Sequence, residues 1–144
     1  MTQAPENKQV IVKNQTVFMF DKPNTNNRIY PKDAAERIVD KINNGQMYGY
    51  VGFETVTPQF DLTKVSHLVK NARIEGDYVI ADIVALDTPQ GQVLKQLINE
   101  KPNCGVNFAV AGIGKYKEDT HIIEDFECWY ISATIDPVSH MANE

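Results

Sequence analysis

The stretch DTPQGQVLKQLINEKPNCGVNFAVAGIG, residues 87–114, joins a helix pattern directly to a glycine-rich segment. Thr88 can accept a hydrogen bond from the first helical turn, and Pro89 suits the first helical position, where its missing N–H has no helical partner. The apolar residues that recur at the spacing of one helix face are Val93, Leu94, Leu97 and Ile98. The pattern predicts a helix over about 88–101 that ends at Lys101-Pro102.

The segment after this helix, CGVNFAVAGIG (104–114), has the composition of a loop that leads into a strand. It contains three glycines and a single polar side chain, Asn107, among apolar residues. It is not a phosphate-binding loop, because it lacks the Lys-Ser/Thr ending and does not clearly open a helix. The residue types alone leave open whether this segment carries chemistry.

A second helix pattern lies over about 31–44, nearer the N-terminus. Pro31 suits the first turn, and Asp33 adds negative charge near the positive end of the helix. The residues that share one helix face are Ala34, Ala35, Ile38, Val39 and Ile42. Gly45 can take the left-handed conformation that ends a helix.

The remaining patterned segments are β-prone. Two strand pieces are expected in 9–20, a strand with an exit loop in 46–56, an extended segment in 65–74 and a last strand in 122–135. Glu75-Gly76-Asp77 is a plausible hairpin turn before YVIADIVAL, whose loose alternation predicts a strand covered on both faces. A charged turn is expected at 117–121.

The expected order, β-β-α-β-β-β-α-β-β, predicts an α+β fold with a mostly antiparallel, curved or barrel-like sheet and two main helices. The chain of 144 residues favours one domain. We expect this domain over 9–137, with a flexible lead at 1–8 and a short tail at 138–144.

Charge and hydropathy narrow the classes of partner and location. The net charge of −5 argues against a nucleic-acid surface, because there is no basic excess to neutralise phosphates. No apolar run reaches the length that spans a bilayer, and the polar N-terminus lacks a signal-peptide core. These patterns predict a protein made and used inside a cell, or released by lysis.

The residue types give no convincing catalytic or metal site. The three histidines, His67, His121 and His140, do not pair with other ligands at metal-binding spacing, so neither a metal nor a cofactor is expected. His67 lies between apolar neighbours and is interpreted as structural. Ser66 precedes it, and on a strand the two side chains would point to opposite faces. The acidic residues interpreted as solvated or turn positions are Glu54, Glu75, Glu124 and Asp125.

Two cysteines, Cys104 and Cys128, are isolated and lack C-x-x-C spacing. They are interpreted as half-buried thiols. A disulfide, or a reactive Cys104 that meets a histidine in space, stays open as an alternative.

Several segments in order resemble one family. NTNNRIYP (24–31) is similar to an Asn-Arg-x-x-Arg-x-Tyr-Pro pattern before the first helix; Asn24, Arg28, Tyr30 and Pro31 fit it, and Thr25 replaces the first Arg. A strand like VSHLV, a hairpin with a Gly-Asp turn and a helix like D-T-P-x-G-x-x-L follow. Over about 9–137 the chain resembles the prohead (capsid maturation) proteases of large tailed bacteriophages. This resemblance implies a fold related to the herpesvirus assembly protease, assemblin.

The chain departs from this family at the positions that the resemblance implies are catalytic. Phe53 stands where the family's Gly-x-x-x-His-Pro motif has its histidine. Asn107 and Phe108 stand at the two serines of its Gly-Val-Ser-Ser-Arg-Gly loop, after the matching Gly105 and Val106. Ala109 or Val110 replaces the Arg, and the loop is about two residues longer. We expect the two phenylalanines to pack together in the former cleft.

The resemblance thus implies a catalytically inactive, protease-like phage head protein that lacks base and nucleophile. Its expected partners are the major capsid protein or other head proteins, not nucleic acid or membrane, and self-association is compatible with this role. Its expected place is the virion head, with the host cytoplasm during assembly. Two alternatives remain open: an assembly regulator that binds or inhibits the active prohead protease, and a protease with a relocated site.

Overall fold

The computed structural model describes residues 10–24, 27–45, 47–52, 62–100 and 106–134. Along the chain, the elements are β1 (Val10–Met19), α1 (Lys32–Asn43), β2 (Tyr48–Gly49), the 3-10 helix η2 (Leu62–Lys64), β3 (His67–Glu75), β4 (Tyr78–Ala85), α2 (Pro89–Asn99), β5 (Asn107–Tyr116) and β6 (Ile123–Thr134). The expected α+β class with antiparallel strands and two main helices is confirmed.

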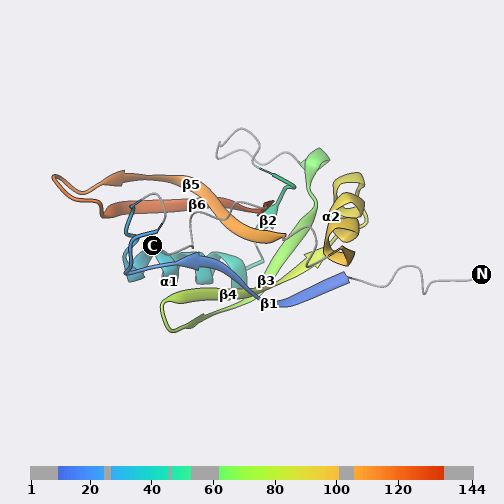
Figure 1. The fold of residues 1–144 in the computed structure, drawn as a ribbon, viewed down its shortest axis with the longest axis horizontal. Coiled ribbons are helices and arrows are strands. Elements are labelled where there is room, and N and C mark those ends of the chain that lie inside the picture. Colours follow the sequence, from blue (N-terminus) through green and yellow to red (C-terminus); the bar gives the residue numbers. More distant parts are fainter. Residues whose placement is uncertain (1–9, 25–26, 46, 53–61, 101–105, 135–144) are drawn as a thin grey trace, which may run out of the picture.

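The described strands form two sheets rather than a closed barrel. One sheet has four antiparallel strands in the order β1-β4-β3-β2, and β5 and β6 form a two-stranded ribbon. Helix α1 packs against β3 of the larger sheet and against β6 of the ribbon, while α2 packs against β4. Figure 1 shows the ribbon running along one side of the molecule, with α2 at the end opposite the hairpin tip.

Local sequence signals mark the ends of both helices. Thr88 accepts a hydrogen bond from the Gly91 N–H (2.9 Å), and Pro89 is the first helical residue, as expected. Pro31 is not in the first turn of α1 but is its N-cap, with extended backbone. Gly45 takes φ +75° just beyond the other end, as expected. Val93 was expected on the buried face of α2, but its side chain is 45% exposed. The buried residues of this helix are Gly91 and Leu94.

The strand expectations hold with two changes. The two pieces expected over 9–20 are the single strand β1, which continues through two register shifts. The strand expected over 46–56 is short in the described residues: β2 has two residues, and Val51 makes an isolated bridge to Ala133. The hairpin turn is found at Gly76 (φ +62°), and every residue of β4 after Tyr78 is buried, as expected for a strand covered on both faces.

A carboxylate in the middle of β4 organises the two neighbouring strands. Asp82 is 7% exposed and accepts hydrogen bonds from the Asn14 backbone N–H and the Asn71 side chain, both at 3.0 Å. The ladders on both sides change register here, with left-handed backbone at Asn14 (φ 60°) and Asn71 (φ 56°). The Arg73 guanidinium lies 3.5 Å from the carboxylate. The two bulges therefore turn polar groups toward one buried charge.

The charge of Asp82 should make the stability of the protein depend on acid pH. Burial favours the neutral acid, but the bonds from Asn14 and Asn71 and the charge of Arg73 together outweigh burial and lower the pKa of Asp82. This contribution is present above the ordinary pKa of an aspartate and is lost as the pH falls through the lowered value. We expect Asp82→Asn to reduce the free energy of unfolding at neutral pH by about 1–3 kcal/mol, and to lose part of its acid dependence.

Urea unfolding at neutral and acid pH measures both effects, with the exposed Asp40→Asn as the matched control. Equal stability losses in the two variants would contradict the role of Asp82.

Candidate functional site

Three chain segments meet at the C-terminal end of β6. On one side, β5 pairs with it, with Asn107 opposite Thr134 and Phe108 opposite Ala133. On the other side, residues 50–52 run parallel to it: the Gly52 N–H donates to the Ala133 oxygen (2.7 Å), and the Ala133 N–H donates to the Tyr50 oxygen (2.9 Å). Residues 49–52 thus leave the larger sheet and join the ribbon.

This meeting place holds the positions singled out in the sequence. Asn107 is exposed at the start of β5, and Phe108 beside it is 1% exposed. Phe53 lies outside the described residues, but Gly52, which precedes it, lies across β6 from Phe108. Because β6 lies between them, these two chain segments are about 10 Å apart. The two motifs therefore come together in space, although β3, β4 and α2 all lie between them in the sequence.

Phe108 covers a histidine. Its ring lies edge to face with the His67 ring, with 5.5 Å between centroids and 73° between planes. The expected contact between Phe108 and Phe53 lies outside the described residues. His67 therefore occupies the inner side of the site, beneath the residue that stands at a serine position of the resembled loop.

His67 is buried and fully hydrogen-bonded. Its Nε2 lies 2.7 Å from the Ile131 backbone oxygen, which can only accept, so Nε2 carries the proton. Nδ1 then accepts from the Ser66 hydroxyl at 2.5 Å. Burial lowers the pKa of His67 to about 4, against which the Ile131 bond acts weakly. The imidazole is therefore neutral at physiological pH.

The geometry of Ser66 and His67 corrects one expectation. The two side chains were expected on opposite faces of a strand, but β3 begins at His67, so Ser66 is outside the strand alternation and turns toward the ring. A hydroxyl beside an imidazole is the arrangement of an activated nucleophile. Here, both residues have 0% exposure, so a substrate has no surface on which to meet the hydroxyl.

Glycine is required at position 49 for this arrangement. A Cβ there would lie 1.8 Å from the Ile131 oxygen and 2.1 Å from His67 Nε2, where it would displace the hydrogen bond. The Gly49 oxygen also accepts the Ser66 N–H at 2.9 Å. Gly49, Ser66, His67 and Ile131 thus form one buried unit that joins the larger sheet to β6.

The motif residues before α1 lie apart from this unit. Asn24 is buried and accepts from the Arg28 N–H through its side chain (3.1 Å), which closes the loop. Tyr30 packs edge to face on Phe18 (5.0 Å) and Phe126 (4.9 Å). Arg28 reaches the hairpin and donates to Tyr116 Oη at 3.1 Å. Asn24 thus closes the loop, Arg28 holds it against β5 and Tyr30 holds it against β6, while Pro31 caps α1.

The remaining candidate residues show no shared site. Cys128 is buried, and burial raises the pKa of its thiol to about 12, so this thiol is not reactive. Cys104, Gly105 and His140 lie outside the described residues; Val106 is buried. His121 is exposed, with Asn27 at 3.4 Å. Among the described residues, no cluster of three or more His, Cys, Asp or Glu side chains can hold a metal.

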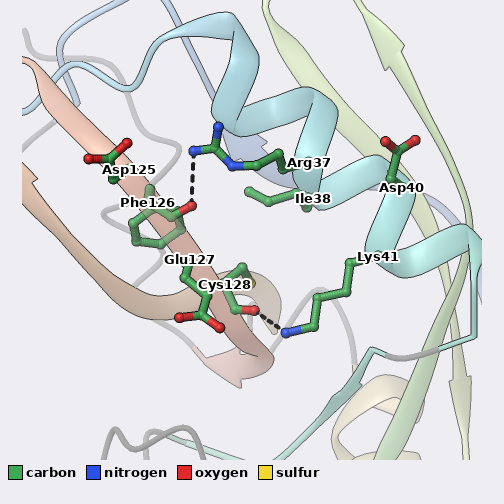
Figure 2. A pocket seen from close by; sticks show the side chains of 8 residues that line it. All are labelled: Arg37, Ile38, Asp40, Lys41, Asp125, Phe126, Glu127 and Cys128. Atoms are coloured by element: carbon green, nitrogen blue, oxygen red, sulfur yellow. Dashed lines mark hydrogen bonds between the residues drawn. The ribbon is translucent and has the colours of Figure 1, made fainter.

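Sequence reasoning missed the hydrogen bonds to the backbone oxygens on the outer edge of β6, the edge that faces away from β5. The Phe126 and Cys128 backbone oxygens accept from Arg37 (3.2 Å) and Lys41 (2.6 Å) of α1, as Figure 2 shows. His67 satisfies the Ile131 oxygen in the same way. No local signal identifies these bonds, because each joins residues more than sixty positions apart.

No family model and no curated protein matches this sequence. Among solved structures, the chain is similar to the bacteriophage T4 capsid assembly protease, gp21, with a TM-score of 0.67 and 16% sequence identity. The match covers 88% of this chain and 96% of that one. The chain has the fold of this protease. The expected prohead protease-like fold is therefore confirmed, over nearly the whole length of both chains.

In the described part of the chain, no helix is both long enough and apolar enough to cross a bilayer.

The neutral, buried His67 should weaken the protein as the pH falls. In the unfolded chain a histidine has its ordinary pKa near 6.5, whereas His67 in the folded protein titrates at about 4. Between these values the unfolded state binds the extra proton, so stability is full above pH 6.5 and declines toward pH 4. We expect the free energy of unfolding to drop by about 2 kcal/mol from pH 7.5 to pH 5 through this residue.

Urea unfolding of the wild type and of His67→Gln at both pH values isolates the effect, since the variant should be less stable but less sensitive to pH. His121→Gln, which changes an exposed histidine, is the matched control. An unchanged pH dependence in His67→Gln would contradict the buried neutral state.

Proposed function

We propose that this chain is a catalytically inactive, prohead protease-like head protein of a tailed bacteriophage, which binds capsid components in a structural role. The observation that carries the proposal is Phe108, which stands at a serine position of the resembled catalytic loop. It is 1% exposed and packs on His67. The resemblance at this position and the burial of the ring together support the loss of the nucleophile.

The chemistry of the neighbouring positions supports the loss of catalysis. Asn107, at the other serine position, carries an amide, which is a poor nucleophile. Phe53, at the histidine position, has no atom that can take a proton. Ser66 and His67 are close enough to act together, but they are enclosed, and the ring's Nε2 is already bonded to Ile131.

The fold supports a role in the phage head. A similar solved structure is a capsid assembly protease, and a fold that recognises capsid proteins can persist as a binding module after catalysis is lost. The proposed partners are the major capsid protein or other head proteins. The protein would act in the virion head as a decoration, cement or minor component, after assembly in the host cytoplasm.

Loss of catalysis predicts that a serine-directed probe will not label the protein. A fluorophosphonate reacts with a serine only when a base activates it, so we expect no labelling of the folded chain, as for the matched variant Ser66→Ala. An active serine protease serves as the positive control for the probe. Stoichiometric labelling of the wild type that disappears in Ser66→Ala would contradict the proposal and assign activity to the Ser66–His67 pair.

A structural head role predicts that the protein stays in the finished particle. Quantitative mass spectrometry of purified mature particles should find many copies in a fixed ratio to the major capsid protein, because head proteins occupy symmetric positions. Absence from mature particles but presence in immature heads would contradict the structural role. That result would favour an assembly regulator that is later removed.

A further inference from the structure

A groove of about 670 Å³ lies between α1 and β6, on the β6 edge that faces away from β5 (Figure 2). It is distinct from the His67 site, which lies nearer the C-terminal end of β6. Four residues of α1 and four of β6 line it. Its walls are therefore a helix and the edge of a strand, which is the setting in which proteins accept an added strand.

The edge of β6 in this groove is occupied by side chains rather than by a strand. The Phe126 and Cys128 oxygens, two residues apart, accept from Arg37 and Lys41. Alternate carbonyls are the acceptors that a neighbouring strand uses. Long, flexible basic side chains can leave these oxygens at small cost, since a peptide N–H would replace each bond.

Extended segments already pair with this edge at both ends of the groove. Ile29 makes a parallel bridge beside Ile122, and its oxygen accepts the Ile123 N–H at 2.8 Å. At the other end, residues 50–52 run parallel to β6 at Ala133. Among the described residues, no backbone segment pairs with the outer edge between these two points. An added strand would therefore pair with the same edge of β6 that segments of this chain already use at both ends.

We propose that this groove binds an extended segment of a partner protein as an added strand on β6, and that the segment carries acidic residues at alternate positions. Its N–H groups would replace Arg37 and Lys41 at the Phe126 and Cys128 oxygens. Both cations would then face the side chains of the added strand.

The spacing and direction of the positive charges of Arg37 and Lys41 favour a partner segment with acidic residues at alternate positions. Arg37 and Lys41 are about 6 Å apart along α1, close to the roughly 6.6 Å between alternate side chains of a strand. Three carboxylates line the groove. The Asp40 carboxylate points away from β6 in Figure 2, and Asp125 pairs with Lys115 of β5 (3.6 Å). Glu127 is exposed and alternates with the buried Phe126 and Cys128, so its side chain lies on the opposite face of β6 from theirs. Asp33, which pairs with Arg37 at 2.8 Å, is exposed and can be displaced by a peptide carboxylate.

A peptide titration tests the groove directly. The probe is the blocked hexapeptide Thr-Glu-Val-Glu-Thr-Gly, added to the ¹⁵N-labelled full chain and followed by the amide signals of Phe126 and Cys128 and by Arg37 Nε. We expect saturable shifts confined to β6 and α1. Two control peptides, one with Lys for both Glu and one with the two Glu adjacent, should bind at least about tenfold more weakly, since salt-sensitive charge contacts are lost.

A matched pair of double variants tests whether the positive charges of the groove bind the acidic peptide. Arg37→Gln with Lys41→Gln should weaken binding of the acidic peptide at least about tenfold, whereas Lys13→Gln with Lys32→Gln, which removes equal charge elsewhere, should not. Should the first variant not fold, the comparison of the three peptides on the wild type still decides. Shifts elsewhere on the protein, or equal binding of the lysine peptide, would overturn the proposal.

A second copy of the chain is the remaining occupant to test. Groove signals that move with protein concentration alone would show self-association and overturn the proposal of an acidic partner segment. The peptide titration and the proposed head role are tested separately. If no peptide binds in the groove, the copy number of the protein in phage particles still tests the head role.

Discussion

Side chains donate hydrogen bonds to backbone oxygens on the outer edge of strand β6, and the bond from His67 is the one on which the joining of the two sheets depends. A buried backbone oxygen without a hydrogen bond costs about 1–3 kcal/mol. Arg37 and Lys41 reach two of these oxygens from α1, and His67 reaches a third from β3. The enclosed His67 bond joins the larger sheet to the ribbon, whereas Arg37 and Lys41 cover the edge from α1 with exchangeable bonds. The His67 bond is the most demanding, because it requires a proton on Nε2 and a glycine at position 49.

The same bond bears on what the site can do. A general base needs a free ring nitrogen within reach of the proton that it removes. Both nitrogens of His67 have partners inside the protein, and Phe108 covers the ring. The side chains at this end of β6 therefore favour packing over proton transfer. The groove between α1 and β6 lies outside this interior and is the surface that we propose binds a partner.

Local features of the fold could be read from the sequence, and long-range ones could not. The Thr88 cap, the Gly45 stop and the turn at Gly76 depend on neighbours within a few residues, and all three were predicted correctly. Val93 was misplaced because the helical period alone does not show that Gly91 brings α2 close to the Leu86 backbone. The Ser66–His67 contact was missed because alternation assumes that both residues belong to the strand. No local signal pairs His67 with Ile131. The roles expected for Phe53 and Cys104 stay predictions, because both lie outside the described residues.

At the centre of the site is a neutral imidazole enclosed between Ile131, Ser66 and Phe108, and the protonation of the His67 ring can be measured directly. A long-range ¹H–¹⁵N spectrum of the full chain at neutral pH reports which nitrogen carries the proton and how fast it exchanges with water. We predict a proton on Nε2 and none on Nδ1, in slow exchange. A proton on Nδ1, a charged ring or rapid exchange with solvent would contradict the account and reopen the site to catalysis.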